Sequence, residues 1–279
     1  MASFNLLNIG TQALNTNNTA LATTSQNIAN ANTDGYTRQR SEIMSVNGLG
    51  GSYVQSISRT TDQFLTKQMW SDVSTYKSLN IQDNLMSQTD NLLASSSTSL
   101  STALDNYFVS MQNAVDDPTS LANRELYIEQ TNALSRRFND LSAQLDVQND
   151  SVNETLKSST ALLNEYSQSI ADINKQINYL TARDEPTNEL KDQRDLLINK
   201  ISELVDVQVV EQGADFNMFI GNGQPLVVGD SVNRIEYRQG DPDPTQPQLF
   251  VYSGASELEI SDKLQGGTIG GVLEFRENT

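Results

Sequence analysis

The sequence contains no cysteine and no histidine among its 279 residues. Without cysteine the chain can form neither disulfides nor thiolate metal sites, and without histidine it lacks the commonest general base and the usual zinc ligand. We therefore predict that the chain is not an enzyme and that it binds neither a cofactor nor a metal ion. Aromatic residues are also few, with 8 Phe, 9 Tyr and 1 Trp. The apolar residues are mostly aliphatic, which suits helix seams better than a large globular core.

Positive charge is scarce, with 18 Lys and Arg against 35 Asp and Glu and a net charge of −17. Nucleic acid and anionic membranes both need a cationic surface, so neither is expected as a partner. No stretch approaches the roughly 18 apolar residues of a membrane span, and the N-terminus lacks the basic and apolar regions of a secretory signal. Residues 1–60 hold three arginines and two acids, so all the net acidity lies downstream.

Charged residues are absent from Met1 to Thr33, and this run contains a regular apolar pattern. Its large apolar residues recur every seven positions, so a helix here would carry one narrow stripe on a surface of Asn, Thr, Ser and Gln. The stripe consists of Leu7, Leu14, Leu21 and Ile28. One such stripe cannot offset the entropy of ordering. We therefore expect an assembly arm at residues 1–36 that is disordered alone and helical in a polymer.

The lack of charge in this arm favours self-assembly, because uncharged flanks let identical copies pack closely without Coulomb repulsion. The alternative is a short amphipathic helix that docks through its stripe on the body of its own chain. A turn follows, in which Gly35 is the expected positive-φ position and Tyr36 an anchor.

Residues 27–39, NIANANTDGYTRQ, together with Leu21 and residues 2–7, resemble the signature of the axial proteins of the bacterial flagellum, a family of rod, hook and hook-associated proteins. Many members have Pro where this chain has Asp34; since both residues open turns, the departure leaves the turn intact. The residues that carry the resemblance are Asn27, Ile28, Ala29, Asn30, Asn32, Thr33, Gly35, Tyr36 and Arg38.

The middle of the chain shows helical spacing. We expect a connector at residues 37–61 with room for a short extended hairpin, then a long-helix bundle at 62–204. Asp62 is a predicted N-cap, and the Asp-Asp-Pro sequence at 116–118 predicts a helix end. The longest helix is expected at 120–183, with a seam at about 3.5 residues per step, which is coiled-coil spacing. Its apolar seam consists of Leu134, Phe138, Leu141, Leu145, Val152, Leu156, Leu163, Tyr166, Ile170, Ile173, Ile177 and Leu180.

A shorter helix is expected from about residue 187 to 204, after the stop at 184–186. It carries Asp192, Gln193, Arg194 and Asp195. We interpret the Arg194 and Asp195 pair, with Asp192 nearby, as a salt-bridge patch on the helix surface, with an intersubunit contact as the alternative. The helix also resembles a segment of one hook-associated member of the axial family, located at the junction of hook and filament.

Beyond residue 204 the apolar spacing changes to two, which predicts a small antiparallel β domain at 205–265. A return segment to the helical body is expected at 266–279. The sequence GGTIGG within it lacks the residues of a phosphate-binding loop, so we predict a turn or bulge there. Three acidic pairs could be proposed as catalytic or Ca²⁺ sites, but each lies beside Pro in a helix stop or loop where Asp is common. These pairs are Asp116 with Asp117, Asp184 with Glu185, and Asp241 with Asp243.

The predicted fold is mainly α with a small β domain: an elongated antiparallel bundle of long coiled-coil helices, an antiparallel β domain and an N-terminal assembly helix. The resemblance implies a structural subunit of the hook–filament junction that polymerises with itself into a tubular layer. It also implies contacts with hook protein, a neighbouring hook-associated protein, the flagellar export apparatus and, as a further candidate, an export chaperone.

The resemblance further implies an extracellular location in the flagellum, reached unfolded through the export channel without a cleaved signal. Family members continue to a C-terminal helix that pairs with the N-terminal arm, so we expect this chain to be the front part of the molecule. Two alternatives remain open. One is another axial protein, from the hook or rod, and the other is a secreted acidic helical effector or adhesin.

Overall fold

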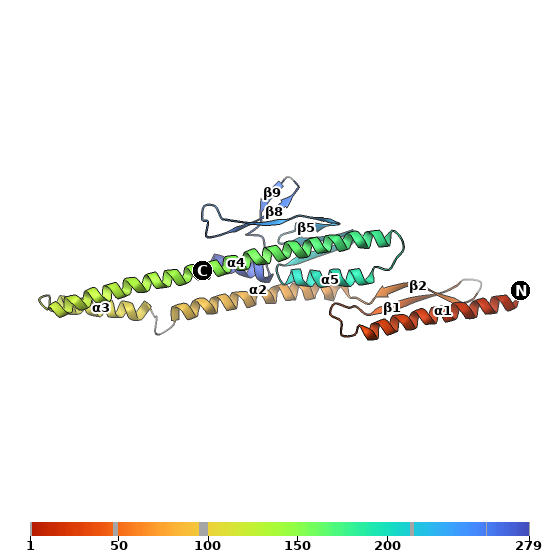
Figure 1. Cartoon of the computed structure of the whole chain (residues 1–279), viewed down its shortest axis with the longest axis horizontal. Helices are drawn as coiled ribbons and strands as arrows, with labels where there is room; N and C mark the ends of the chain where they lie inside the picture. Colours follow the sequence, from red (N-terminus) through yellow and green to blue (C-terminus); the bar gives the residue numbers. More distant parts are fainter. Residues whose placement is uncertain (1, 47–49, 95–99, 213–214, 255, 279) are drawn as a thin grey trace. The chain divides into compact units, whose positions relative to one another are not determined.

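A computed structural model describes most of the chain (Figure 1). The described residues are 2–46, 50–94, 100–212, 215–254 and 256–278. They fall into two compact units, which are treated separately below. Unit 1 comprises Met1–Ser74 and Leu163–Arg234, and unit 2 comprises Thr75–Leu162 and Ile235–Thr279.

Unit 1 begins with a helix and a hairpin. Helix α1 (Ala2–Ala29) lies along the antiparallel pair β1 (Gln39–Ser45) and β2 (Ser52–Arg59), as Figure 1 shows at the N-terminal end. The predicted connector is therefore a true hairpin. Helix α2 (Gln63–Ala94) starts directly after it. The Asp62 carboxylate accepts hydrogen bonds from the backbone N–H groups of Phe64 and Leu65 at 2.9 and 3.2 Å, so the predicted N-cap is confirmed.

The rest of unit 1 packs helices against a sheet. The end of α4 (Leu121–Thr181) and α5 (Asn188–Ser202) join a four-stranded antiparallel sheet in the order β3-β4-β5-β6. Its strands are β3 (Val207–Gln212), β4 (Asp215–Ile220), β5 (Gln224–Val228) and β6 (Ser231–Val232). The fully buried core side chains include Ile170, Ile198, Ile201, Met218, Ile220 and Leu226. This core fixes α5, whose charged side chains are considered below.

Unit 2 combines helices with a second sheet. It contains the remainder of α2, α3 (Leu100–Asp116) and the first part of α4, together with a three-stranded antiparallel sheet and helix α6 (Gly267–Asn278). The strands are β7 (Ile235–Arg238), β8 (Gln248–Ser253) and β9 (Ser256–Glu259). Its buried apolar residues include Leu85, Val152, Leu156, Leu249, Ile269 and Phe275.

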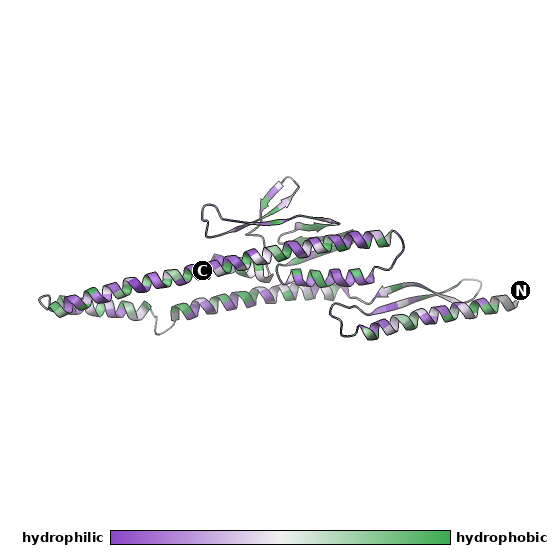
Figure 2. Cartoon of the chain, viewed as in Figure 1, coloured by the Kyte–Doolittle hydropathy of each residue, from purple (hydrophilic) through white to green (hydrophobic). Residues whose placement is uncertain are grey.

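Helix α4 is the longest element, at 61 residues, and spans roughly 92 Å at about 1.5 Å per residue. The predicted span of 120–183 is confirmed to within two residues. The seam is buried at Val152, Leu156, Leu163, Ile170, Ile173 and Ile177, whereas Phe138 and Leu145 are exposed. Figure 2 shows hydrophilic and hydrophobic residues interspersed along the long helices. No helix in the described part of the chain is long and apolar enough to cross a bilayer.

Two features of the C-terminal third differ from the prediction. The strands expected in one β domain form two sheets, which lie in different compact units. Alternating residues show which segments are strands but not which strands pair, so this division was not readable from the pattern. The predicted bundle at 62–204 is likewise divided between the units.

The second difference is GGTIGG: Gly266 lies in a bend before the helix, and residues 267–271 form the first part of α6 rather than a turn or bulge. Ile269, Val272 and Phe275 supply a buried helical face, and the glycines permit a close approach to α2. A Cβ placed on Gly271 would lie 2.2 Å from Ile81 Cγ2 and 2.6 Å from the Ser78 carbonyl oxygen. Two glycine pairs lower helix propensity, and the prediction followed propensity rather than packing.

This close approach predicts that Gly271→Ala is destabilising, although alanine is the better helix former. Overpacking a core costs about 1–3 kcal/mol, whereas the gain in propensity is only about 1 kcal/mol. Gly10→Ala in α1 is the matched control, because nothing lies within 4 Å of its Cβ position. Urea unfolding should show a lower free energy of unfolding for Gly271→Ala and an equal or higher one for Gly10→Ala. Equal stability of both variants would contradict the packing argument.

Candidate assembly surface

Helix α1 contacts the hairpin through a face of mostly small residues that begins with Ile9 and Ala13 and continues with polar side chains. Thr16 and Thr23 are buried on this face. The Thr16 hydroxyl donates to the Ser52 carbonyl oxygen at 2.8 Å, and the Thr23 and Ser41 hydroxyl oxygens are 3.0 Å apart. The same face continues to Asn27 and Asn30, which are partly buried. The hairpin therefore covers the side of the helix that holds Thr16 and Thr23 and leaves the opposite side exposed.

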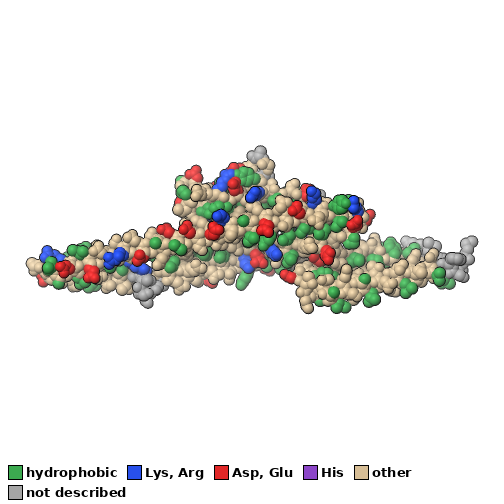
Figure 3. Space-filling model, viewed as in Figure 1, with side chains coloured by type: hydrophobic (Ala, Val, Ile, Leu, Met, Phe, Trp, Pro, Cys, Tyr) green, Lys and Arg blue, Asp and Glu red, His purple; other side chains and the backbone are tan. Residues whose placement is uncertain are grey.

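The opposite side of α1 carries the apolar stripe, and it is exposed. Leu7, Leu14, Leu21 and Ile28 are 64 to 73% exposed. The alternative of a helix docked through its stripe is wrong for the described structure, because the other face docks. Figure 3 shows apolar and uncharged side chains over the α1 end of the molecule. That the arm is disordered when isolated stays a prediction.

Asn27 of the family motif joins α1 to the first strand. Its amide nitrogen donates to the Gln39 carbonyl oxygen at 2.8 Å, and its amide oxygen accepts from the Gln39 backbone N–H at 2.8 Å. The same oxygen accepts from the Tyr36 hydroxyl at 2.9 Å. One side chain thus pairs with the backbone of β1 as a neighbouring strand would, which blocks that part of the sheet edge. A shorter or longer side chain would lose this match.

The turn between α1 and β1 is held by further motif residues. Gly35 has φ = 77°, as predicted, and a Cβ there would lie 3.3 Å from Leu196 Cβ on α5. Burial raises the pKa of the Tyr36 hydroxyl, and Asp192 and Glu189 add to this effect. The Asn30 amide oxygen accepts from the Thr33 hydroxyl at 3.2 Å. The other motif residues, Ile28, Ala29, Asn32 and Arg38, are exposed.

A buried ionic cluster anchors the hairpin to α5. One nitrogen of Arg59, Nη1, lies 2.8 Å from Asp192 Oδ1 and 2.7 Å from Asp195 Oδ2. The second Asp192 oxygen accepts the backbone N–H of Thr37 at 3.1 Å. Asn188 adds a hydrogen bond from its amide to the Ile57 carbonyl oxygen at 2.6 Å. The start of β1 and the end of β2 are therefore both fixed to the same helix.

Arg194 points to a different part of unit 1. Its guanidinium donates to Asn174 Oδ1 of α4 at 3.2 Å, forms an ion pair with Glu211 of β3 and lies 4.1 Å from the ring centroid of Phe216 of β4. The Asn174 amide in turn donates to the Gly229 carbonyl oxygen at 2.7 Å. Arg194 thus connects α5, α4 and the four-stranded sheet.

The predicted surface patch on α5 is therefore wrong. Asp192 and Arg194 are only 6% and 5% exposed, and only Gln193 of the four residues is fully on the surface. Adjacent helix positions point in different directions, so Arg194 and Asp195 cannot pair with each other as proposed. Asp192 and Asp195, three positions apart, share a face and therefore share Arg59.

The cluster shifts the ionisation of its members. Burial raises the pKa of the Asp195 carboxyl, against the opposing effect of Arg59. For Arg59, burial acts to lower the pKa of the guanidinium, but its two carboxylate partners outweigh burial and raise it. Burial lowers the pKa of Arg194. Local sequence patterns do not identify Arg59, Asn174 or Glu211 as members of these clusters; the available signal was three arginines in a region that precedes a strongly acidic one.

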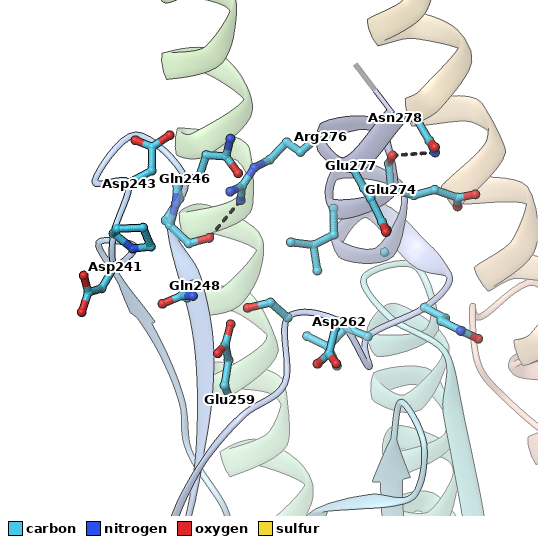
Figure 4. A pocket seen from close by; sticks show the side chains of 17 residues that line it. Asp241, Asp243, Gln246, Gln248, Glu259, Asp262, Glu274, Arg276, Glu277 and Asn278 are labelled. Carbon is cyan, nitrogen blue, oxygen red and sulfur yellow. Dashed lines mark hydrogen bonds between the residues drawn. The ribbon is translucent and has the colours of Figure 1, made fainter.

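Among the described residues there is no group of His, Cys, Asp and Glu that could hold a metal ion. A hollow of about 870 Å³ in unit 2 contains the acidic residues Asp241, Asp243, Glu259, Asp262, Glu274 and Glu277 (Figure 4). Asp243, a member of one of the three acidic pairs, is hydrogen-bonded within its own loop. Its carboxylate accepts from the Thr245 hydroxyl and backbone N–H at 2.7 and 2.9 Å.

Comparison with known protein families connects both ends of the sequence to the flagellum. Residues 86–279 match the family described as Flagellar hook-associated protein FlgK helical domain, and residues 7–37 match Flagella basal body rod protein. The second match covers the stripe and most of the predicted motif. The first covers most of the chain and distinguishes it from hook and rod proteins.

Curated relatives give the same result. Flagellar hook-associated protein 1 of Salmonella typhimurium (strain LT2) is 34% identical over 284 residues, which cover 97% of this chain and 51% of the relative. The Escherichia coli (strain K12) protein of the same name is 32% identical, with 97% and 52% coverage. The chain thus spans about half the length of the curated relatives it matches. The names of these relatives place them in the flagellum.

A solved structure supports the fold. The flagellar hook junction protein FlgK from Burkholderia pseudomallei matches with a TM-score of 0.68 and 26% identity, over 75% of this chain and 39% of that chain. The predicted fold class, mainly α with antiparallel sheets, and the predicted family are both confirmed. The chain belongs to the FlgK family of flagellar hook-associated proteins.

Proposed function

We propose that this chain is part of a structural subunit that forms the junction between the flagellar hook and filament by polymerising into a tubular layer. One observation carries the proposal. A helix without charged residues has its Thr16 and Thr23 face against its own hairpin, while its regular apolar stripe remains exposed. An exposed stripe of this kind marks a surface that another polypeptide covers.

The free energy gained by burying the stripe is comparable to the free-energy cost of association. Burying one Leu or Ile side chain contributes about 1.5–3 kcal/mol. The four stripe residues therefore supply about 6–12 kcal/mol per subunit when fully covered, which is comparable to the roughly 4–15 kcal/mol cost of association. Assembly through the stripe is then favourable only when several contacts form together. This suits a polymer that grows at one end rather than random aggregation.

The proposed mechanism is coupled folding and assembly. The arm travels through the export channel unfolded, without a cleaved signal, and becomes a packed helix when neighbouring subunits and a C-terminal helix of the longer protein cover its stripe. The arms then line the inside of the tube and the β sheets face outward. The family membership and the likeness to the flagellar hook junction protein of Burkholderia pseudomallei support a place at the junction.

This function implies a set of partners. Copies of the chain contact one another, and the layer contacts hook protein on one side and a neighbouring hook-associated protein on the other. The export apparatus handles the unfolded chain, and an export chaperone is a further candidate. The proposed location is the extracellular flagellum. The acidic surface, with a net charge of −17, fits protein partners better than nucleic acid or an anionic membrane.

Deleting the protein tests the proposal directly. Electron microscopy of the deletion strain should show hooks without attached filaments, because no layer links the two structures. Filament protein should instead accumulate in the culture medium. Expression of the full-length protein from a plasmid should restore filaments in the same strain. Filaments of normal number and attachment in the deletion strain would overturn the junction assignment.

A further inference from the structure

Two tyrosines are in contact near the corner at which α3 turns back into α4, within unit 2 (Figure 1). The hydroxyl oxygens of Tyr107 on α3 and Tyr127 on α4 are 3.2 Å apart, and their ring centroids are 5.5 Å apart. The ring of Phe108 lies edge-on to Tyr107 at 5.3 Å. The chain has 9 Tyr, but no other two tyrosine rings are in contact among the described residues. This pair therefore differs from the other tyrosines in its surroundings.

Hydrogen bonds at the corner hold the two helices beside each other. The Asp117 carboxylate accepts from the Thr119 hydroxyl and backbone N–H at 2.9 and 3.2 Å, which stabilises the turn. Between the turn and the tyrosines, the Asn123 amide donates to the Asn113 carbonyl oxygen at 3.1 Å. The two phenol rings are therefore brought together by the fold around them and do not need to meet by diffusion.

Two phenols in this arrangement are suited to oxidative coupling. An oxidant removes one electron and one proton from each phenol, and the two radicals join through a ring carbon next to each hydroxyl group. The hydrogens of the joined carbons move to the oxygens, which restores both hydroxyls, so the net loss is two electrons and two protons. These reduce one molecule of hydrogen peroxide to two of water when a haem peroxidase supplies the oxidant. The hydroxyl contact brings the reacting carbons close together, and both rings are only half-buried, so solvent reaches them.

The composition of the chain leaves such a bond without competition from disulfides, because the sequence has no cysteine. We propose that Tyr107 and Tyr127 form a modification site, at which hydrogen peroxide and a peroxidase produce a dityrosine that ties α3 covalently to α4. The two residues are 20 positions apart, so the bond closes a loop and restricts the unfolded chain as a disulfide does. The inference goes beyond the proposed junction function and does not depend on it.

Oxidation of the purified full-length protein tests the site. The protein is treated in dilute solution with hydrogen peroxide and a peroxidase, and it is then digested with trypsin. Trypsin cleaves after Arg124, which lies between the two tyrosines, so peptides 78–124 and 125–136 separate unless they are linked. We expect a product with the summed mass of these two peptides less two hydrogen atoms. The blue fluorescence of dityrosine should appear in the monomer band of a denaturing gel.

Phenylalanine variants identify the reacting rings. Tyr107→Phe and Tyr127→Phe each keep the ring but remove one hydroxyl. Each should lower the dityrosine fluorescence of the monomer at least about tenfold, since rings held in contact couple far faster than rings that meet by chance. Tyr76→Phe is the matched control, because Tyr76 is 65% exposed on α2 and touches no other tyrosine ring in the described chain, so its fluorescence should equal that of wild type. Oxidation should raise the urea midpoint of wild type but not that of Tyr107→Phe.

Three results would overturn the proposal. One is a wild-type digest without the linked peptides, or monomer fluorescence in Tyr127→Phe equal to that in Tyr76→Phe. Another is fluorescence confined to dimers, which would assign the coupling to collisions between molecules. The third is a link that leaves the urea midpoint of wild type unchanged, because the bond would then not tie the helices. If circular dichroism shows one phenylalanine variant to be misfolded, the linked peptides of wild type and the other variant decide the question.

Discussion

Replacing Leu14 and Leu21 together by Asn should abolish filament attachment while leaving the isolated protein folded. Both side chains are exposed in the single chain, so their loss removes no core contact. In the assembled layer each contributes about 1.5–3 kcal/mol of apolar burial. Their combined loss of about 3–6 kcal/mol weakens each subunit contact about 10²- to 10⁴-fold. Asn is chosen because it keeps the arm free of charge.

The matched control is the pair Leu14→Met and Leu21→Met, which conserves side-chain volume and apolarity. Complementation of the deletion strain, read by electron microscopy and swarming, should give filaments for the Met pair and bare hooks for the Asn pair. Urea unfolding of the purified proteins should differ by no more than about 1 kcal/mol, which is the helix-propensity cost of two Asn residues. Normal filaments with the Asn pair would show that the stripe is not the assembly surface.

Secretion separates assembly from export in this experiment. The Asn pair should appear in the culture medium in amounts equal to or above wild type, because the subunits leave the cell but fail to add to the hook. A variant retained in the cell would indicate a defect in export, and the stripe would then act in passage rather than in polymerisation. The same measurement on the Met pair fixes the reference level.

The local signals in the sequence predicted the elements that depend on near neighbours. The seven-residue spacing of the stripe, the Asp62 cap, the positive φ of Gly35 and the ends of α4 were all readable from short windows. Each follows from side-chain periodicity or from the conformational range of one residue. What these signals could not show is that the helix would dock through its other face, because its partners on the hairpin are the Ser41 hydroxyl and backbone groups of Ser52 and Gln39.

The ionic cluster was beyond such reasoning for a different reason. Arg59 and Asp192 are 133 positions apart, and Arg59 and Asp195 are 136 apart. A helical segment with alternating charges is usually a solvated face, and that expectation gave the wrong environment for Asp192 and Arg194. Similarly, the Gly-rich start of α6 has the local pattern of a turn, but its buried apolar face and its close approach to Ile81 and Ser78 favour a helix. Long-range packing overrode local preference in both cases.

Arg59→Met should be the most destabilising single substitution in the hairpin. It leaves the buried Asp192 and the partly buried Asp195 without their common cation. Breaking a buried pair in this way costs about 3–5 kcal/mol, because the remaining charge stays away from water. Arg40→Met is the matched control. It removes the same charge from the same hairpin, but Arg40 pairs with Glu42 at a site where the arginine side chain is 70% exposed, so the cost should be within about 1 kcal/mol.

The pH dependence of the free energy of unfolding is an independent test of whether an unpaired carboxylate destabilises Arg59→Met. Because the pKa of the Asp195 carboxyl is raised in the folded state, its contribution favours folding at low pH and is lost as the pH rises through the folded pKa. Arg59 opposes this rise, so removing it raises the carboxyl pKa further. The stability deficit of Arg59→Met against wild type should therefore shrink as the pH falls from 7 toward about 4. A deficit that stays constant over this range would mean that lost packing, not an unpaired carboxylate, is the cause.

Neutralising the acids should rescue the variant. The triple substitution Arg59→Met, Asp192→Asn and Asp195→Asn removes all three charges, so it should be more stable at pH 7 than Arg59→Met alone, although not as stable as wild type. The coupling energy from the corresponding mutant cycle, measured by urea unfolding, should be about 1–3 kcal/mol. The rescue should be incomplete, because Asp192 has two roles in the wild type: it pairs with Arg59 and accepts the Thr37 N–H. In Asp192→Asn the side-chain amide can still accept the Thr37 N–H, but it no longer anchors the second strand through an ion pair. If the triple variant has no higher free energy of unfolding than Arg59→Met, the loss of stability comes from the other contacts of the arginine. The ionic cluster would then not be the anchor of the hairpin.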